Sequence, residues 1–204
     1  MSMAKVRSLG NRPYRDVWLD MQAFTRNRNS GTEDEIWVVE HPPVYTQGTS
    51  CRDLPRVNPH NIPVIHTDRG GKMTYHGPGQ LVSYLLFDIK RMNSGPRSFV
   101  RAVENLVVGF LSDYGVTGEL VAGAPGVYVE GRKIAALGLR ISRGRSYHGL
   151  SVNVDTNLEA FASIDPCGFQ GLEVANLRDW VPEVDFESVR DDFIRRCSDP
   201  SLFL

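Results

Sequence analysis

The sequence predicts an α+β fold in which helices flank mixed sheets. Two amphipathic helical patterns are separated by several short apolar strands, and a run of meandering strands follows the second helix. This order differs from the regular strand–helix alternation of a doubly wound parallel sheet. No break in composition divides the 204 residues, so we expect a single domain spanning residues 1–204.

The first third of the chain predicts one helix between short strands. After a strand at 6–9, Pro13 suits the first turn of a helix whose apolar residues recur at helical spacing until the stop signal at 29–31. The apolar run IWVV predicts a buried strand at 36–39. A proline-containing loop at 49–63 is expected near the functional site, because long ordered loops often bind ligands. Further strands are expected at 44–47 and 64–67.

The segment 69–80, RGGKMTYHGPGQ, has an unusual composition. It holds four glycines and a proline around Thr74, Tyr75 and His76. Glycine permits positive φ and a close approach between backbone and ligand. A hairpin with glycine at its corners is the alternative interpretation. The apolar strand expected at 81–88 would hold the segment against the core, which favours a binding loop.

The second half predicts a core helix and then meandering strands. The helix begins at Pro96, carries an apolar stripe, and ends near 114–115. Turns are expected at 130–131 and 143–144, and a last packing helix at about 186–197. The strands of this half are expected at 116–120, 127–130, 133–141 and 147–154.

Charge and composition exclude several classes of protein. A net charge of −1 offers no global attraction for nucleic acid or a membrane surface. No apolar run is long enough to span a bilayer and the N-terminal residues are polar, so a soluble cytoplasmic protein is expected. Cys51, Cys167 and Cys197 are too few and too far apart for a disulfide framework or a zinc site, and we expect no metal.

Three residues have side chains suited to chemistry. Lys133 begins an apolar strand: it is either a solvated strand end or, if it points into a pocket, a usable base. Cys167 lies in a Pro-Cys-Gly turn, where a bend presents the sulfur and a glycine N–H could face an oxyanion, although most free cysteines are buried small hydrophobic residues. His41 is either a ligand contact or a loop histidine bonded to the backbone.

Five ordered blocks resemble the lipoyl(octanoyl) transferase family, which moves an octanoyl group from acyl carrier protein to a lysine of lipoyl domains. The blocks are HPPVYTQG (41–48), RGGKMTYHGPGQ (69–80), GRKIAALGLR (131–140), HGLSVNV (148–154) and PCG (166–168). The resemblance covers most of the chain. It implies an α+β fold shared with biotin and lipoate protein ligases, without their ATP site and without a cofactor.

The resemblance also implies roles for particular residues. Cys167 matches the nucleophile and Lys133 its partner. His76 and His148 either shape the site or are buried, hydrogen-bonded histidines, and Lys72 is given no individual role. The residues expected to bind the acyl group are Arg69, Gly70, Gly71, Lys72, Met73, Thr74, Tyr75, His76, Ala136, Leu137, Gly138, His148, Gly149, Leu150 and Ser151.

The implied partners are two kinds of protein. Octanoyl-acyl carrier protein is the donor, and lipoyl domains of 2-oxoacid dehydrogenase E2 subunits and the glycine cleavage H protein are the acceptors. Arginines at 140–145 and at 52 and 56 could steer acidic partners. Charge reversal at Arg143 and Arg145 should then lower the rate and its salt dependence, and unchanged kinetics would rule steering out. The rival functions are an ATP-dependent lipoate or biotin ligase and a non-catalytic acyl-binding module.

Overall fold

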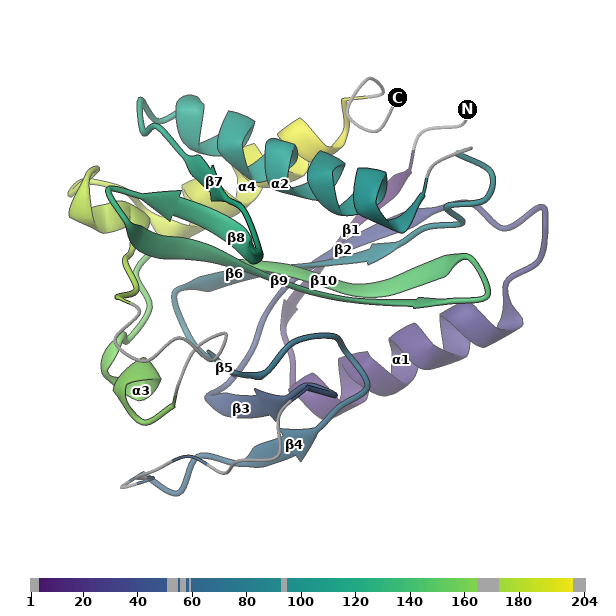
Figure 1. Ribbon diagram of the computed structural model, residues 1–204, viewed down its shortest axis with the longest axis horizontal. Helices are drawn as coiled ribbons and strands as arrows, with labels where there is room; N and C mark the ends of the chain where they lie inside the picture. The colour runs from purple at the N-terminus through teal and green to yellow at the C-terminus, as the bar shows by residue number, and fades with distance from the viewer. Residues whose placement is uncertain are drawn as a thin grey trace.

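The computed structural model describes residues 4–50, 55, 58, 60–92, 95–164 and 173–199. Its main feature is a seven-stranded sheet with helices on both faces (Figure 1). The strands lie in the order β1 (Lys5–Asn11), β2 (Glu35–Glu40), β6 (Gln80–Leu86), β10 (Arg145–Asn153), β9 (Arg132–Ser142), β8 (Ala124–Val129) and β7 (Glu119–Val121). Only β1 and β2 are parallel among these neighbours, so the sheet is mixed.

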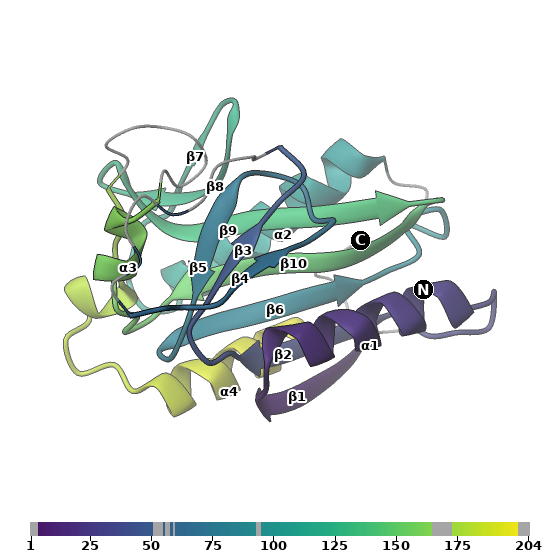
Figure 2. The same ribbon diagram turned by 90° about the horizontal axis from the view of Figure 1, so that it is seen from below.

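A smaller sheet lies on the same side of the large sheet as α1 (Figure 2). It contains β4 (Val64–His66), β3 (Val44–Gln47) and β5 (Met73–His76), and β3 is parallel to β4 and antiparallel to β5. The helices are α1 (Tyr14–Asn27), α2 (Pro96–Ser112), α3 (Glu159–Ala162) and α4 (Phe186–Cys197). These findings confirm the predicted α+β class with mixed sheets.

The central strand β6 is buried on both faces, which explains its continuous apolar sequence. Leu81 and Leu85 belong to the core that the sheet forms with α2 and α4. The alternate residues Val82 and Tyr84 belong to the core beneath α1. The sheet thus separates two cores, and the α1 side also carries the glycine-rich segment.

Most predicted elements are confirmed, with two corrections. The middle of the glycine-rich segment is not loop: Met73–His76 forms β5, because it pairs with β3. The strand predicted at 116–120 begins later, at Glu119. The reason is that the backbone N–H of Val116 donates to Leu111 O and closes the end of α2, with Gly115 at a φ of 72°.

None of the helices among the described residues is both long and apolar enough to cross a bilayer. Within the same residues, no group of three or more His, Cys, Asp or Glu side chains could hold a metal ion.

Candidate active site

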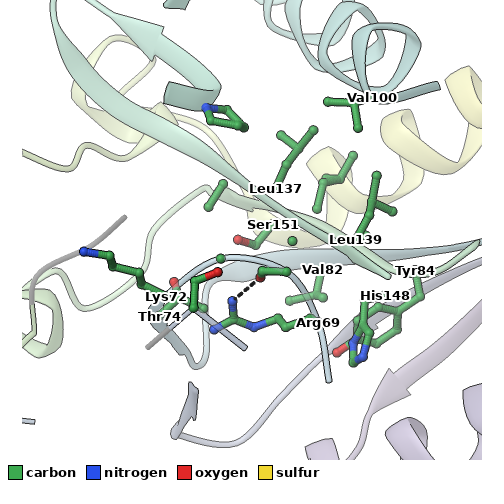
Figure 3. Close-up of a pocket in the computed structure, with 18 of the residues that line it drawn as sticks. Arg69, Lys72, Thr74, Val82, Tyr84, Val100, Leu137, Leu139, His148 and Ser151 are labelled. Carbon is green, nitrogen blue, oxygen red and sulfur yellow. Dashed lines mark hydrogen bonds between the residues drawn. The ribbon is translucent and has the colours of Figure 1, made fainter. Parts of the chain in front are cut away.

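A cavity of about 480 Å³ lies between the large sheet and the segment that leads into β5 (Figure 3). Strands β6, β9 and β10 and residues 69–74 line it, together with Val100 of α2 and residues 123–125 at the β7–β8 turn. The residues of the expected acyl site that line it are Arg69, Gly70, Gly71, Lys72, Met73, Thr74, His76, Ala136, Leu137, Gly138, His148, Gly149, Leu150 and Ser151. Segments far apart in the sequence therefore meet around one space.

Tyr75 does not line this cavity. Its side chain is on the opposite face of β5 from Thr74 and His76, because neighbouring residues of a strand point to opposite faces. Together with Tyr45 it lines a second cavity of about 580 Å³, and its ring lies edge-on to Phe161, with 5.6 Å between ring centroids. The structure thus separates Tyr75 from the other residues expected to contact an acyl group.

Arg69 holds the glycine-rich segment in place. Its side chain is buried and donates to the carbonyl and hydroxyl oxygens of Thr46, at 2.6 Å and 3.0 Å from Nη2. Its Nη1 donates to Gly70 O at 2.9 Å (Figure 3). The N–H of Gly70 in turn donates to Leu139 O of β9 at 3.0 Å. The segment is therefore bonded to both sheets and forms a fixed wall.

Glycine at two positions allows this wall to approach its neighbours. A Cβ at Gly48 would lie 2.3 Å from Gly71 O, and a Cβ at Gly138 would lie 3.2 Å from Arg69 Cδ. Contacts as short as the first are not tolerated between real atoms, so a side chain at Gly48 would displace the segment. These two glycines serve close packing between parts of the protein itself.

His41 and His76 are buried close to the cavity and are neutral. His41 donates through Nδ1 to Arg12 O at 2.6 Å, so its Nε2 accepts from the Tyr84 hydroxyl at 2.7 Å. His76 donates through Nδ1 to the amide oxygen of Gln80 at 2.7 Å, since the Gln80 amide nitrogen donates elsewhere. Burial lowers the pKa of His41 to about 4 and that of His76 to about 3. The backbone-bonded interpretation of His41 is confirmed.

His148 connects the cavity to the half-buried carboxylate of Asp68. Its Nε2 donates to Asp68 Oδ1 at 2.9 Å, and its Nδ1 accepts from the Tyr14 hydroxyl at 3.3 Å. Burial lowers the pKa of His148, against the opposing effect of Asp68. Burial alone would raise the pKa of Asp68, but hydrogen bonds from His148, Tyr147 and Trp18 outweigh it and hold that pKa well below its ordinary value. His148 adopts a φ of 57°, a conformation that these contacts maintain.

Lys133 is buried beside the cavity, with a relative exposure of 3%. Its ammonium donates to Pro125 O at 2.8 Å and lies 5.3 Å from the centre of the Tyr128 ring. Gly126 makes room for it, because a Cβ there would lie 2.5 Å from Lys133 Cε. The solvated strand end is therefore the wrong interpretation of Lys133.

Lys133 also adjoins the chain that follows the Pro-Cys-Gly segment. It lines a small cavity of about 20 Å³ together with Thr74 and Ser151, which also line the large one. The backbone N–H of Lys133 donates to Glu173 O at 2.8 Å, and that of Ala175 donates to Lys133 O at 3.0 Å. Cys167, like Cys51, Arg52 and Arg56, lies outside the described residues.

Sequence reasoning missed several residues that line the cavity. Tyr14 belongs to the apolar stripe of α1, and Tyr84 belongs to an apolar strand. Periodicity marks both as buried but does not distinguish packing against protein from packing against a ligand. The other lining residues outside the predicted set are Ser50, Val82, Val100, Gly123, Ala124, Pro125, Leu139 and Ile141.

Acid should destabilise the fold through His41 and His76. The unfolded imidazoles have an ordinary pKa of 6.5 and the folded ones a lower pKa, so the unfolded chain binds more protons below pH 6.5. The contribution of each histidine to the free energy of unfolding is therefore fully present above about pH 6.5. Below that pH it falls by about 1.4 kcal/mol per pH unit towards pH 4. Urea unfolding should show a loss of about 4 kcal/mol between about pH 7 and pH 5. His66→Gln, at an exposed position, should keep this loss, and equal stability at both pH values would contradict the prediction.

The chain is similar to known proteins over most of its length. Residues 13–198 match the lipoyl protein ligase A/B catalytic domain. An octanoyltransferase of Alkalilimnicola ehrlichii is 50% identical over 193 residues, which cover 95% of this chain and 90% of that protein. An octanoyltransferase of Actinobacillus pleuropneumoniae is 50% identical over 188 residues, which cover 90% of this chain and 86% of that protein.

Two solved structures share the fold. The bipartite lipoate protein ligase of Thermoplasma acidophilum has a TM-score of 0.76 at 18% identity, over 96% of this chain and 82% of that one. Biotin protein ligase from Aquifex aeolicus has a TM-score of 0.53 at 12% identity, over 97% of this chain and 68% of that one. The expected likeness to biotin and lipoate protein ligases is confirmed at the level of fold. By its sequence, the chain belongs to the lipoyl(octanoyl) transferase family, within the lipoyl protein ligase A/B catalytic domains.

Proposed function

We propose that this protein transfers an octanoyl group from acyl carrier protein, through a thioester on Cys167, to the acceptor lysine of lipoyl domains. The observation that carries the proposal is the largely apolar cavity of about 480 Å³ with a buried lysine, Lys133, beside it. The octanoyltransferases that are 50% identical to the chain support the same reaction.

The first half-reaction forms the acyl-enzyme. The Cys167 thiolate attacks the thioester carbonyl of the donor, and a new C–S bond replaces the bond to the pantetheine sulfur. The Lys133 ammonium gives its proton to the departing sulfur, which leaves as a thiol. Lys133 is suited to this step because its hydrogen bond to Pro125 O and the room at Gly126 hold the ammonium in one place.

The second half-reaction forms the amide. The acceptor lysine attacks the acyl carbonyl as a neutral amine, the Cys167 thiolate leaves, and the neutral Lys133 amine takes the proton from the new amide nitrogen. Both residues return to their starting state, so the cycle is balanced. Exchange between thioesters is nearly neutral in energy and amide formation is favourable, so no ATP is required. Ping-pong kinetics are expected.

The cavity suits the hydrocarbon chain of the substrate. Its lining is mostly apolar side chains and backbone, as binding an alkyl chain requires. Burying about six methylenes contributes roughly 5 kcal/mol at most, at about 0.8 kcal/mol each. We place the acyl chain against 69–74, 136–138 and 149–151, with its carbonyl end towards Lys133.

The acceptors we propose are the lipoyl domains of 2-oxoacid dehydrogenase E2 subunits and the glycine cleavage H protein. The Thermoplasma acidophilum ligase that shares this fold was described together with its E2 lipoyl domain. Octanoyl-acyl carrier protein is the proposed donor. Its acidic contact face would meet the arginines of the β9–β10 turn, of which Arg143 is exposed.

The decisive experiment is octanoyl transfer without nucleotide. Purified protein, octanoyl-acyl carrier protein and an unmodified lipoyl domain are mixed in the absence of ATP, and the mass of the lipoyl domain is followed. We expect the mass to increase by one octanoyl group. Modification only with free octanoate and ATP would instead indicate a ligase, and binding of octanoate without transfer would indicate a non-catalytic acyl-binding module.

A further inference from the structure

Aromatic rings line the buried end of the large cavity. Tyr14, the first residue of α1, stacks on His76 with 5.6 Å between ring centroids and an angle of 14° between the rings. It meets Tyr84 edge-on, with 6.4 Å between centroids, and its hydroxyl bonds to His148. All four rings line the cavity and are buried. Lys72 and Gly71, by contrast, are exposed and mark its open end.

The four rings at this buried end are uncharged, and their polar atoms are occupied. The ring nitrogens of His148 are bonded to Asp68 and Tyr14, and the Tyr84 hydroxyl is bonded to His41. The rings therefore offer mainly carbon atoms to whatever occupies the cavity. A methyl group suits such a surface, whereas a polar chain end would lose its hydrogen bonds to water without replacement.

The stretch of β10 between Ser151 and His148, which both line the cavity, has about the length of an eight-carbon chain. Ser151 borders both the small cavity at Lys133 and the large one. His148 precedes it by three residues of β10, so it lies roughly 10 Å away at about 3.3 Å per residue. Seven bonds of an extended octanoyl chain span about 8 Å, because the three bonds of an extended residue span about 3.5 Å. Two more methylenes would bring the chain end against the rings.

We propose that Tyr14 determines acyl chain length, because its ring closes the cavity at about eight carbons. This inference rests on the proposed function and adds a specificity residue to it. Tyr14 is well placed for the role because α1 packs on the sheet, and Val17 of its first turn is buried in the core between α1 and the sheet. The ring of Tyr14 is therefore held by the core and by His148 at once, and cannot turn aside for a longer chain.

The test compares donors of different length. Acyl carrier protein is loaded with hexanoyl, octanoyl, decanoyl or dodecanoyl groups, and the rate of acyl-enzyme formation is measured by intact mass for the wild-type protein and Tyr14→Ala. We expect the ratio of decanoyl to octanoyl rates to rise about tenfold or more in Tyr14→Ala, because the two additional methylenes of the decanoyl chain can then be buried. Tyr14→Phe keeps the ring and should keep the wild-type ratio.

Met21→Ala is the matched control. It truncates another buried side chain of α1 that does not line the cavity, so it should lower stability without changing the ratio. Tyr14→Leu is the second variant if Tyr14→Ala fails to fold. If the folded variant keeps the wild-type ratio of decanoyl to octanoyl rates, this inference is wrong. The proposed function would be unaffected as long as the wild-type protein transfers octanoyl groups.

Calorimetric binding of free fatty acids provides a measurement that needs no turnover. The ratio of the Kd for octanoate to the Kd for decanoate should rise about tenfold in Tyr14→Ala. A rise in this ratio would support the inference about Tyr14 even if the wild-type protein transferred no acyl group. The absence of transfer would contradict only the proposed function. An unchanged ratio of Kd values would overturn the inference.

Discussion

Exchange of Lys133 for methionine should slow octanoyl transfer by about 10³-fold while the protein remains folded. An acid–base group in contact with the reacting atoms typically contributes 10²–10⁴-fold to the rate. In the proposed mechanism Lys133 acts in both half-reactions, so formation of the acyl-enzyme and its transfer to the acceptor should both slow. Single-turnover rates of each step, followed by intact mass, would measure this.

The fold should tolerate this change because of the surroundings of Lys133. Methionine has a similar length, and the exchange removes the hydrogen bond that Lys133 donates to Pro125 O. Urea unfolding of Lys133→Met should therefore differ from wild type by no more than about 2 kcal/mol. Lys5→Met, which alters an exposed lysine of β1, is the control and should transfer at the normal rate. A normal rate in Lys133→Met would remove Lys133 from the mechanism.

Cys167→Ser should abolish the acyl-enzyme and lower transfer by at least about 10³-fold. A serine hydroxyl is not ionised at neutral pH, whereas a thiol supplies a few per cent of a much stronger nucleophile even without assistance. Mixing with octanoyl-acyl carrier protein should add one octanoyl group to the wild-type protein and none to the variant. The intact mass of each protein after rapid acid quenching is the measurement.

The other two cysteines are the controls for this experiment. Cys197 is buried in α4, and burial raises its thiol pKa to about 12, so it should be inert. Cys197→Ala and Cys51→Ser should each still form the octanoyl adduct. Loss of the adduct in Cys51→Ser but not in Cys167→Ser would instead identify Cys51, in the loop at 49–63, as the nucleophile.

Local structure was largely predictable from the sequence. The last helix was expected at 186–197 and forms over Phe186–Cys197, where Asp185 caps its first turn by accepting from the backbone N–H of Ser188 at 2.9 Å. The turn at Arg143 and Gly144, where both residues adopt positive φ, was also expected from its glycine. Periodicity and turn chemistry act over a few residues, so a sequence reveals them directly.

The candidate site was predictable only in part. The motif blocks identified the segments around 69–76, 136–138 and 148–151, and the structure brings them to one cavity. The side on which each residue lies was not predictable: Tyr75 was expected in the cavity and faces away from it. In a strand, neighbouring residues point to opposite faces, so a motif that is continuous in sequence is divided by the sheet.

By itself the sequence determined the fold class, the family and the segments that carry the candidate chemistry. Only the tertiary structure decided that Lys133 is buried beside the cavity and that Tyr14 lines its buried end. The contacts responsible join positions far apart in the chain, such as Tyr14 with His148 and Lys133 with Glu173. Such contacts depend on strand register and on how helices pack against sheets, which local patterns of polarity do not specify.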